Sequence, residues 1–203
     1  MARLKNNLYK PMNVDELKDP VVFVVDMVNG FVKEGALADP EIMSIAEGQK
    51  KLMDQLECRN VFVCDTHPPK TREFLSYPQH CMIGTKEAEV IDELKDHIKR
   101  IIHKNSTNTF VAPEFQEFLQ DECSRYKDLI IVGCCTDLCI LQFALSLQSY
   151  LNEHNHCEQR VIVPANLVET YHVEDIHDAY FWNDVSLKNM ATNGILVVSK
   201  IRG

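Results

Sequence analysis

Six short runs of apolar residues recur along this chain, and segments with helical spacing separate them. Each run is almost continuously apolar rather than alternating with polar residues, which is typical of strands buried on both faces of a parallel sheet. Strands that alternate with helices build a sheet covered by helices on both sides. We therefore predict an α/β protein, a doubly wound α/β/α sandwich with a six-stranded parallel sheet, its strands at residues 21–25, 60–64, 100–103, 129–132, 159–163 and 195–198.

The covering helices are predicted from apolar residues that recur every three or four positions. This spacing, and one nearly all-apolar segment at 138–147, place helices in residues 42–56, 88–98, 115–119, 138–147 and 173–190.

Composition restricts the class of protein. A chain of 203 residues with 45% hydrophobic and 25% charged residues is expected to form a single domain over residues 1–203. The net charge of -9, without a basic stripe, argues against nucleic acid or an anionic membrane as a partner. The N-terminal residues lack the apolar stretch of a signal peptide, so we expect a cytoplasmic protein with reduced cysteines. A homo-oligomer stays an open alternative, because segment 138–147 is apolar enough for a subunit interface.

Chemically active side chains follow the first four predicted strands. Asp26, Asp65 and Lys104 come directly after the first three strands, and a turn at residues 133–139 follows the fourth. Ligands bind at the carboxyl ends of the strands in an open parallel sheet. The sequence therefore places two acids, a base and a thiol at one edge of the sheet.

Cys139 lies in the first turn of the predicted helix at 138–147. Unpaired backbone N–H groups and the helix dipole favour a thiolate at this position. Asp26 is a candidate to accept the thiol proton, and Lys104 is a candidate to favour both charged groups. In the alternative interpretation, Cys139 is a small buried hydrophobe, Asp26 ends a strand and Lys104 is a solvated charge.

A second group surrounds an irregular loop at residues 66–86. Asp65 and His67 alternate on an extended chain and can face one ion, and Glu73 and His80 follow within the loop. Carboxylate and imidazole ligands suit a divalent ion such as zinc, manganese or iron. A histidine beside proline in a loop is also a common turn residue.

The turn itself is a third candidate. Backbone N–H groups of Cys135 and Cys139 are placed to hold an oxyanion. The alternative is an ordinary strand-to-helix turn that Thr136 caps.

Five segments in order resemble one family. They are VDMVNGF (25–31), DTHP (65–68), PQHCMIGT (78–85), Lys104, and GCCTDLC (133–139). The chain resembles the isochorismatase-like cysteine hydrolases over residues 21–198, and within them it is most similar to nicotinamidases, also called pyrazinamidases.

The resemblance implies specific roles for these positions. Cys139 matches the nucleophile, Asp26 the proton shuttle and Lys104 the third catalytic residue. The oxyanion donors fall on Cys135 and Cys139, beside a cis peptide between Cys134 and Cys135.

The resemblance also implies a metal site and a pocket. Asp65, His67 and His80 match the metal ligands that hold the pyridine nitrogen of the substrate, and Glu73 is a fourth ligand in some members. Phe31 matches a pocket aromatic, and Phe110 is a second candidate for the pocket.

The activity implied is metal-assisted hydrolysis of a small-molecule amide, nicotinamide, to nicotinate and ammonia through a thioester, with zinc as the first choice of metal. Two departures leave the substrate open: Val28 stands where a Gln is common, and Thr66 stands where a Trp is common. The alternatives are a hydrolase of the same family that acts on an N-carbamoyl or ureido compound, and a non-catalytic ligand-binding or redox-sensing relative. Isochorismate hydrolysis, which needs neither the Cys nor the metal ligands, is disfavoured.

Overall fold

A parallel sheet forms the centre of the computed structural model, which describes residues 8–203. The sheet has the order β4-β3-β2-β5-β6-β8, and the short strand β7 pairs with the end of β5. Neighbouring strands in this sheet are parallel at every pairing within residues 8–203. The strands are β2 (Pro20–Val25), β3 (Arg59–Asp65), β4 (Arg100–Lys104), β5 (Asp128–Cys134), β6 (Arg160–Pro164), β7 (Val168–Glu169) and β8 (Leu196–Val198).

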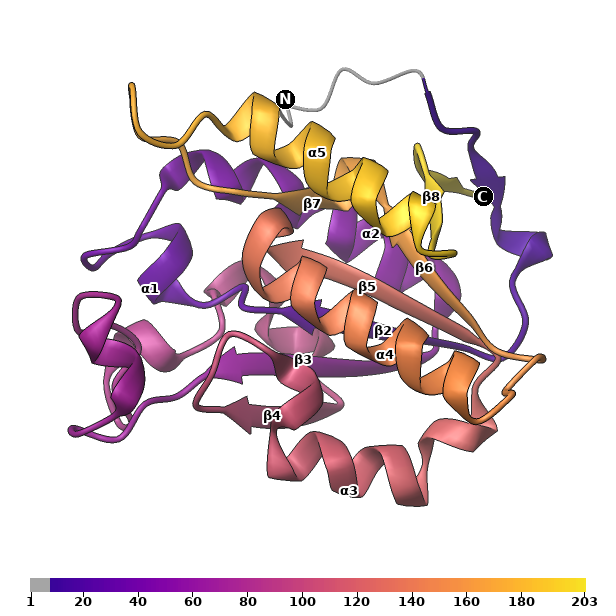
Figure 1. The fold of residues 1–203 in the computed structure, drawn as a ribbon, viewed down its shortest axis with the longest axis horizontal. Helices are drawn as coiled ribbons and strands as arrows, with labels where there is room; N and C mark the ends of the chain where they lie inside the picture. The colour runs from indigo at the N-terminus through magenta and orange to yellow at the C-terminus, as the bar shows by residue number, and fades with distance from the viewer. Residues whose placement is uncertain (1–7) are drawn as a thin grey trace.

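Helices cover both faces of the sheet, as Figure 1 shows. Successive residues of β2 point to opposite sides, so Val21, Phe23 and Val25 enter one core while Val22 and Val24 enter the other. The first core lies under α3 (Pro113–Asp121), α4 (Leu141–Glu153) and α5 (Ala179–Thr192), and the second lies under α1 (Asn29–Val32) and α2 (Ala46–Leu56).

The ring of Phe23 is the centre of the first core. It makes edge contacts with Phe115 and Phe118 of α3 and Phe143 of α4, at centroid distances of 5.9, 5.5 and 5.4 Å. These rings join two helices to the middle strand of the sheet, and edge-to-face pairs add to the stability that burial provides.

The predicted fold class is confirmed, with differences in detail. The sheet has seven strands rather than six, because β7 adds two residues beside β5. Residues 88–98 contain no α-helix. One 3-10 turn, Lys86–Ala88, ends where this range begins, and a second, Asp92–His97, carries the buried Leu94 at the expected spacing. The last helix begins at Ala179 rather than at residue 173, because Asp178 caps its first turn through the Tyr180 N–H.

A second, two-stranded sheet lies outside the main sheet. Its strands, β1 (Met12–Asn13) and β9 (Ile201–Arg202), pair in parallel and join the two ends of the described chain.

None of the helices in residues 8–203 is long and apolar enough to cross a membrane.

The order in which the chain adds strands to the sheet reverses between β2 and β5. The chain adds β3 and β4 on one side of β2, and then returns to place β5 on the other side. Ligand sites of open α/β sheets lie at such a switch point, beyond the carboxyl ends of the strands. The ends of β2 and β5, which carry Asp26 and the turn to Cys139, meet at this point.

Gly133 allows these two strand ends to approach. Its φ is +122°, and a Cβ atom built there would lie 1.9 Å from the carbonyl oxygen of Val25. A side chain at this position would therefore clash with backbone, which has no flexible atom to move aside.

We predict that Gly133→Ala destabilises the protein far more than Gly194→Ala. Gly194 also has a positive φ, of +90°, but a Cβ there meets no atom within 4 Å, so its substitution carries only conformational strain. That strain costs about 1–3 kcal/mol. Urea unfolding of both variants measures the difference, and an equal loss of stability would show that the close approach to Val25 is unimportant.

Candidate active site

Four predicted residues come together at the switch point. Asp26 follows β2, Asp65 and Lys104 end β3 and β4, and Cys139 lies in a turn of π-helix, Thr136–Ile140, after β5. The register explains the meeting, because Asp65 pairs directly with Lys104 in adjacent strands. Single π-turns within helices are frequent at functional sites.

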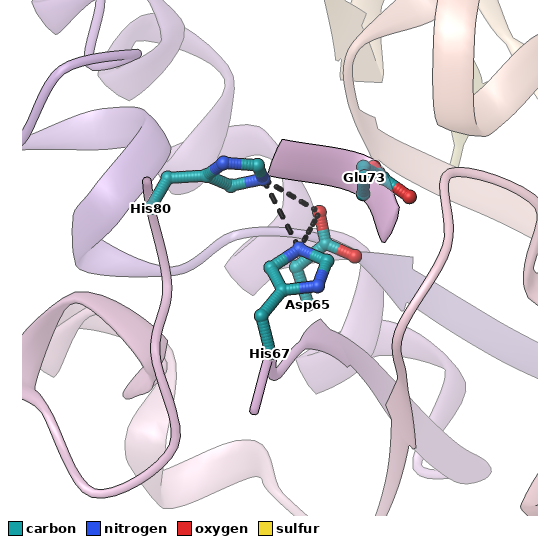
Figure 2. A group of neighbouring side chains, drawn as sticks. All are labelled: Asp65, His67, Glu73 and His80. Atoms are coloured by element: carbon teal, nitrogen blue, oxygen red, sulfur yellow. Dashed lines mark hydrogen bonds and ion pairs between the residues drawn. The ribbon is translucent and has the colours of Figure 1, made fainter. Parts of the chain in front are cut away.

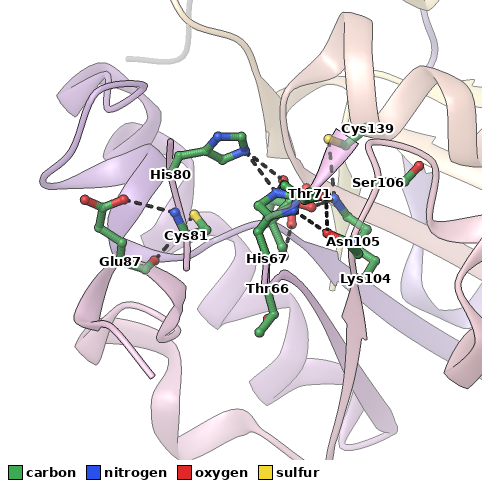
Figure 3. Close-up of polar contacts among 12 residues, drawn as sticks. Thr66, His67, Thr71, His80, Cys81, Glu87, Lys104, Asn105, Ser106 and Cys139 are labelled. Atoms are coloured by element: carbon green, nitrogen blue, oxygen red, sulfur yellow. Dashed lines mark hydrogen bonds and ion pairs between the residues drawn. The ribbon is translucent and has the colours of Figure 1, made fainter. Parts of the chain in front are cut away.

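The ammonium group of Lys104 lies at the centre of this cluster. Its Nζ is 2.9 Å from Asp26 Oδ2 and 3.7 Å from Cys139 Sγ, and it also contacts Asp65 Oδ1. Figure 3 shows Lys104 linked to Cys139 within this network. The side chains of Lys104, Asp26 and Asp65 are buried, so these charges depend on one another for compensation.

The two carboxyl groups have different proton affinities. Burial raises the pKa of Asp26 to about 6, although Lys104 opposes the shift. Burial acts in the same direction on Asp65, but the adjacent Lys104 ammonium holds its pKa well below the usual range. Two neighbouring carboxyl groups with separated pKa values are typical of divided roles. Asp26 is thus the more basic group, and Asp65 stays ionised.

The surroundings of the Cys139 thiol act against a low pKa. Burial raises the pKa of its thiol well above the ordinary value, and Asp26 and Asp65 add to this effect while Lys104 opposes it. Burial therefore opposes the thiolate that the position at the helix start favours, because desolvation penalises the charged form. The thiol needs a base, and a carboxylate oxygen of Asp26 lies within 4.8 Å of Cys139 Sγ.

The turn that carries Cys139 has an unusual hydrogen-bond pattern. The carbonyl oxygen of Cys135 accepts the N–H groups of Leu138 and Ile140, both at 3.1 Å, so these bonds leave out the N–H of Cys139 between them. The peptide bond between Cys134 and Cys135 is cis, as the family resemblance implied. The N–H groups of Cys135 and Cys139 stay the predicted oxyanion donors.

The predicted metal ligands form a second cluster beside the first. One ligand atom each from Asp65, His67, Glu73 and His80 lies within 4.8 Å of the others. Figure 2 shows the two imidazole rings directed at each other and at Asp65, with Glu73 nearby. The loop reaches this position because His67 N–H donates to Cys81 O and Ile83 N–H donates to His67 O.

The chemistry of this donor set fits a cation. His67 Nδ1 lies 2.8 Å from Asn105 Oδ1, and His80 Nδ1 lies 2.8 Å from Pro78 O. Both partners are acceptors, since Asn105 Oδ1 also accepts the Thr71 hydroxyl, so each Nδ1 carries the proton.

The Nε2 atoms of the two rings then present lone pairs to each other. They are 3.1 Å apart, and Asp65 Oδ2 lies 3.6 Å from His67 Nε2 and 3.7 Å from His80 Nε2. Three electron-pair donors at these distances repel one another unless a positive charge lies between them. Neutral imidazole and carboxylate are suitable ligands for zinc and similar ions.

A cavity joins the two clusters. It is lined by Asp65, Glu73 and His80 from the metal group, by Cys135 and Cys139, and by Phe31. Phe31 therefore lies where the resemblance placed it. Phe110 does not line this cavity, because its ring packs on Phe115 and Tyr150 in the core beneath α3 and α4.

Three residues that shape the site, Phe74, Tyr77 and Asn105, were not predicted from the sequence. Tyr77 lines the cavity, and the ring of Phe74 lies 5.3 Å from that of His67 and 5.7 Å from that of His80. Asn105 fixes the His67 ring through Nδ1. Phe74 lies in a short 3-10 turn, Arg72–Leu75, and the other two lie in irregular segments. No periodicity marks any of the three, although Asn105 directly follows Lys104 at a strand end.

The family model of the isochorismatase domain matches residues 20–196. The chain belongs to the isochorismatase family. It is 28% identical over 195 residues to Nicotinamidase 1 of Arabidopsis thaliana, which covers 82% of this chain and 76% of the relative.

Solved structures share the fold. PnC1 from L. infantum in complex with nicotinate has a TM-score of 0.73 at 18% identity, over 91% of this chain and 96% of that chain. The pyrazinamidase of Pyrococcus horikoshii in complex with zinc has a TM-score of 0.71 at 23% identity, over 89% and 99%. The prediction of a hydrolase similar to nicotinamidases is confirmed.

We predict that Asn105→Ala weakens zinc binding by about 10- to 100-fold, because the substitution frees the His67 ring from the contact that directs Nε2 inward. Competition with a chelator, followed by elemental analysis of the protein, measures the affinity. Asn152→Ala, at an exposed position of α4, is the matched control. Wild-type affinity in Asn105→Ala would contradict the assignment of His67 as a ligand.

Proposed function

We propose that this protein is a metal-assisted cysteine amidohydrolase that converts nicotinamide to nicotinate and ammonia. The observation that carries the proposal is the shared cavity, into which both the Cys139 thiol and the Asp65–Glu73–His80 group open. The similarity to Nicotinamidase 1 and to the nicotinate-bound and zinc-bound structures supports the same reaction.

The buried cluster accounts for the first chemical step. Asp26 accepts the proton of the Cys139 thiol, and the sulfur attacks the amide carbon. The N–H groups of Cys135 and Cys139 hold the oxyanion of the tetrahedral intermediate. The adjacent Lys104 ammonium, 3.7 Å from Sγ, stabilises the negative sulfur as the proton leaves.

The amide bond then breaks, and the nitrogen takes the proton from Asp26 and departs as ammonia. The acyl group stays on Cys139 as a thioester. Water attacks this thioester, Asp26 accepts a proton from the water, and the sulfur is released and recovers its proton. A carboxyl group with a pKa of about 6 is suited to both directions of transfer.

The metal group has a separate role. A divalent ion held by Asp65, His67, His80 and Glu73, with zinc as the first choice, would supply a ligand position for the pyridine nitrogen and orient the ring. The aromatic side chains of Phe31 and Tyr77 line the cavity in which the pyridine ring would lie.

We predict that the wild-type protein releases ammonia from nicotinamide and that Cys139→Ala lowers kcat by about 10,000-fold or more, because no other group in the proposal forms the thioester. An enzyme-coupled ammonia assay measures the rates. Cys157→Ala, which removes an exposed thiol, is the control and should keep full activity. Absence of ammonia release by the wild type, or equal rates in Cys139→Ala, would overturn the proposal.

We predict that Asp26→Asn lowers kcat by about 100- to 10,000-fold, the usual contribution of a general acid–base group, with little change in KM. Asparagine still accepts the Asp65 N–H, which lies 2.9 Å from Asp26 Oδ1, but it takes no proton from the thiol. Circular dichroism checks the fold of the variant. A raised KM at unchanged kcat would assign Asp26 to binding instead.

A second candidate is hydrolysis of an N-carbamoyl or ureido compound by the same thiol. It is favoured by Thr66, whose hydroxyl donates to Cys64 O and leaves no aromatic ring at that position. An amide panel with and without a chelator separates the two, because only the nicotinamide reaction uses the pyridine nitrogen. Turnover of ureido compounds that survives chelation would favour this candidate.

A further inference from the structure

An outer cavity of about 380 Å³ adjoins the catalytic cavity. The two share Phe31, Leu37, Tyr77, Cys135 and Leu138, whereas the metal group lines only the inner one. Its volume lies in the range of small-molecule sites. The outer cavity therefore extends the catalytic cavity on the side away from Asp65, Glu73 and His80.

Tyr171 forms part of the far side of this cavity. Its ring stacks on the imidazole of His177, with centroids 3.9 Å apart and planes 13° apart. On its other side, His177 lies nearly parallel to Trp182, at 5.5 Å and 11°. The rings of His177 and Trp182 thus form a stack with Tyr171, in which His177 contacts both of the others.

His177 is also tied to the turn that carries the nucleophile. Its Nε2 lies 2.9 Å from Asp137 Oδ2, two residues before Cys139, and its Nδ1 lies 2.9 Å from Tyr171 O. Both ring nitrogens of His177 are therefore held by hydrogen-bonding partners, one on each side of the ring. The position of Tyr171 is therefore fixed relative to Cys139.

The buried Asp26 decides which part of a substrate reaches the outer cavity. The leaving nitrogen must approach Asp26, which is fully buried and lines neither cavity. Neither cavity therefore offers room at Asp26 for a large leaving amine, whereas ammonia is small. A primary amide is therefore expected, and any extension must belong to the acyl part.

We propose that the outer cavity is a second substrate subsite that binds an apolar, aromatic extension on the acyl side of a primary carboxamide, with Tyr171 as its specificity-determining wall. The inference rests on the proposed amide hydrolysis and narrows its substrate class. An extension on a ring carbon that is not bonded to the pyridine nitrogen, such as C5, leaves that nitrogen free for the metal side and would place apolar surface against Phe31, Leu138 and Tyr171.

The test compares nicotinamide with 5-phenylnicotinamide as substrates. We expect a KM about 10-fold lower for 5-phenylnicotinamide in the wild type, since burial of apolar groups in a pocket is worth at least this factor. Tyr171→Ala should remove this advantage and change the KM for nicotinamide by less than about 2-fold. Tyr180→Ala, at an exposed position on α5 outside the cavity lining, is the control and should retain the advantage.

His177→Gln tests the support behind the wall. It should raise the KM for 5-phenylnicotinamide more than the KM for nicotinamide, as Tyr171→Ala does. Equal changes in KM for the two substrates would assign His177 to the nucleophile turn alone and overturn its role as support for Tyr171.

Binding separates this inference from the proposed function. Calorimetry with 5-phenylnicotinamide and Cys139→Ala reports the subsite without turnover. Tighter binding than nicotinamide that depends on Tyr171 supports the subsite even if the wild type releases no ammonia, in which case only the proposed reaction fails. Equal binding of the two amides, or equal effects of Tyr171→Ala on both, would overturn the subsite.

Discussion

The buried ammonium group of Lys104 is the interaction on which the site depends. It contacts Asp26 and Asp65 and lies 3.7 Å from Cys139 Sγ, and its side chain is shielded from solvent. A buried charge is costly without partners, and two adjacent carboxylates would repel each other without a cation. The three charges therefore hold the ends of β2, β3 and β4 together, and they bring the thiol after β5 into the same environment.

This shared cation also separates the roles of the two acids. Asp65 contacts Lys104 beside the two imidazole rings and stays ionised, whereas burial makes Asp26 the more basic group beside the thiol. Desolvation favours the neutral thiol, so the proposed mechanism needs the base to remove its proton. In that mechanism, activation of the thiol and orientation of the substrate use neighbouring groups linked through Lys104.

Much of this arrangement followed from local patterns. Continuous apolar runs marked the long strands, and the rule for parallel sheets then grouped Asp26, Asp65 and Lys104 at one edge. The helix at 88–98 was wrong because 3-10 turns can bury an apolar residue such as Leu94 at the same spacing. The burial of the Cys139 thiol, which opposes a thiolate, could not be seen in the sequence, whereas the helix start could.

The sequence by itself determined the order of strands and helices, the family motifs and the residue types at the strand ends, because these depend on periodicity and on neighbours in the chain. The tertiary structure decided which loop residues complete the site. Asn105 orients His67, and His177 reaches Asp137 across 40 residues, through contacts that no local pattern encodes. Such pairings depend on how the irregular segments pack on the finished sheet, so only the folded chain reveals the walls of the pocket.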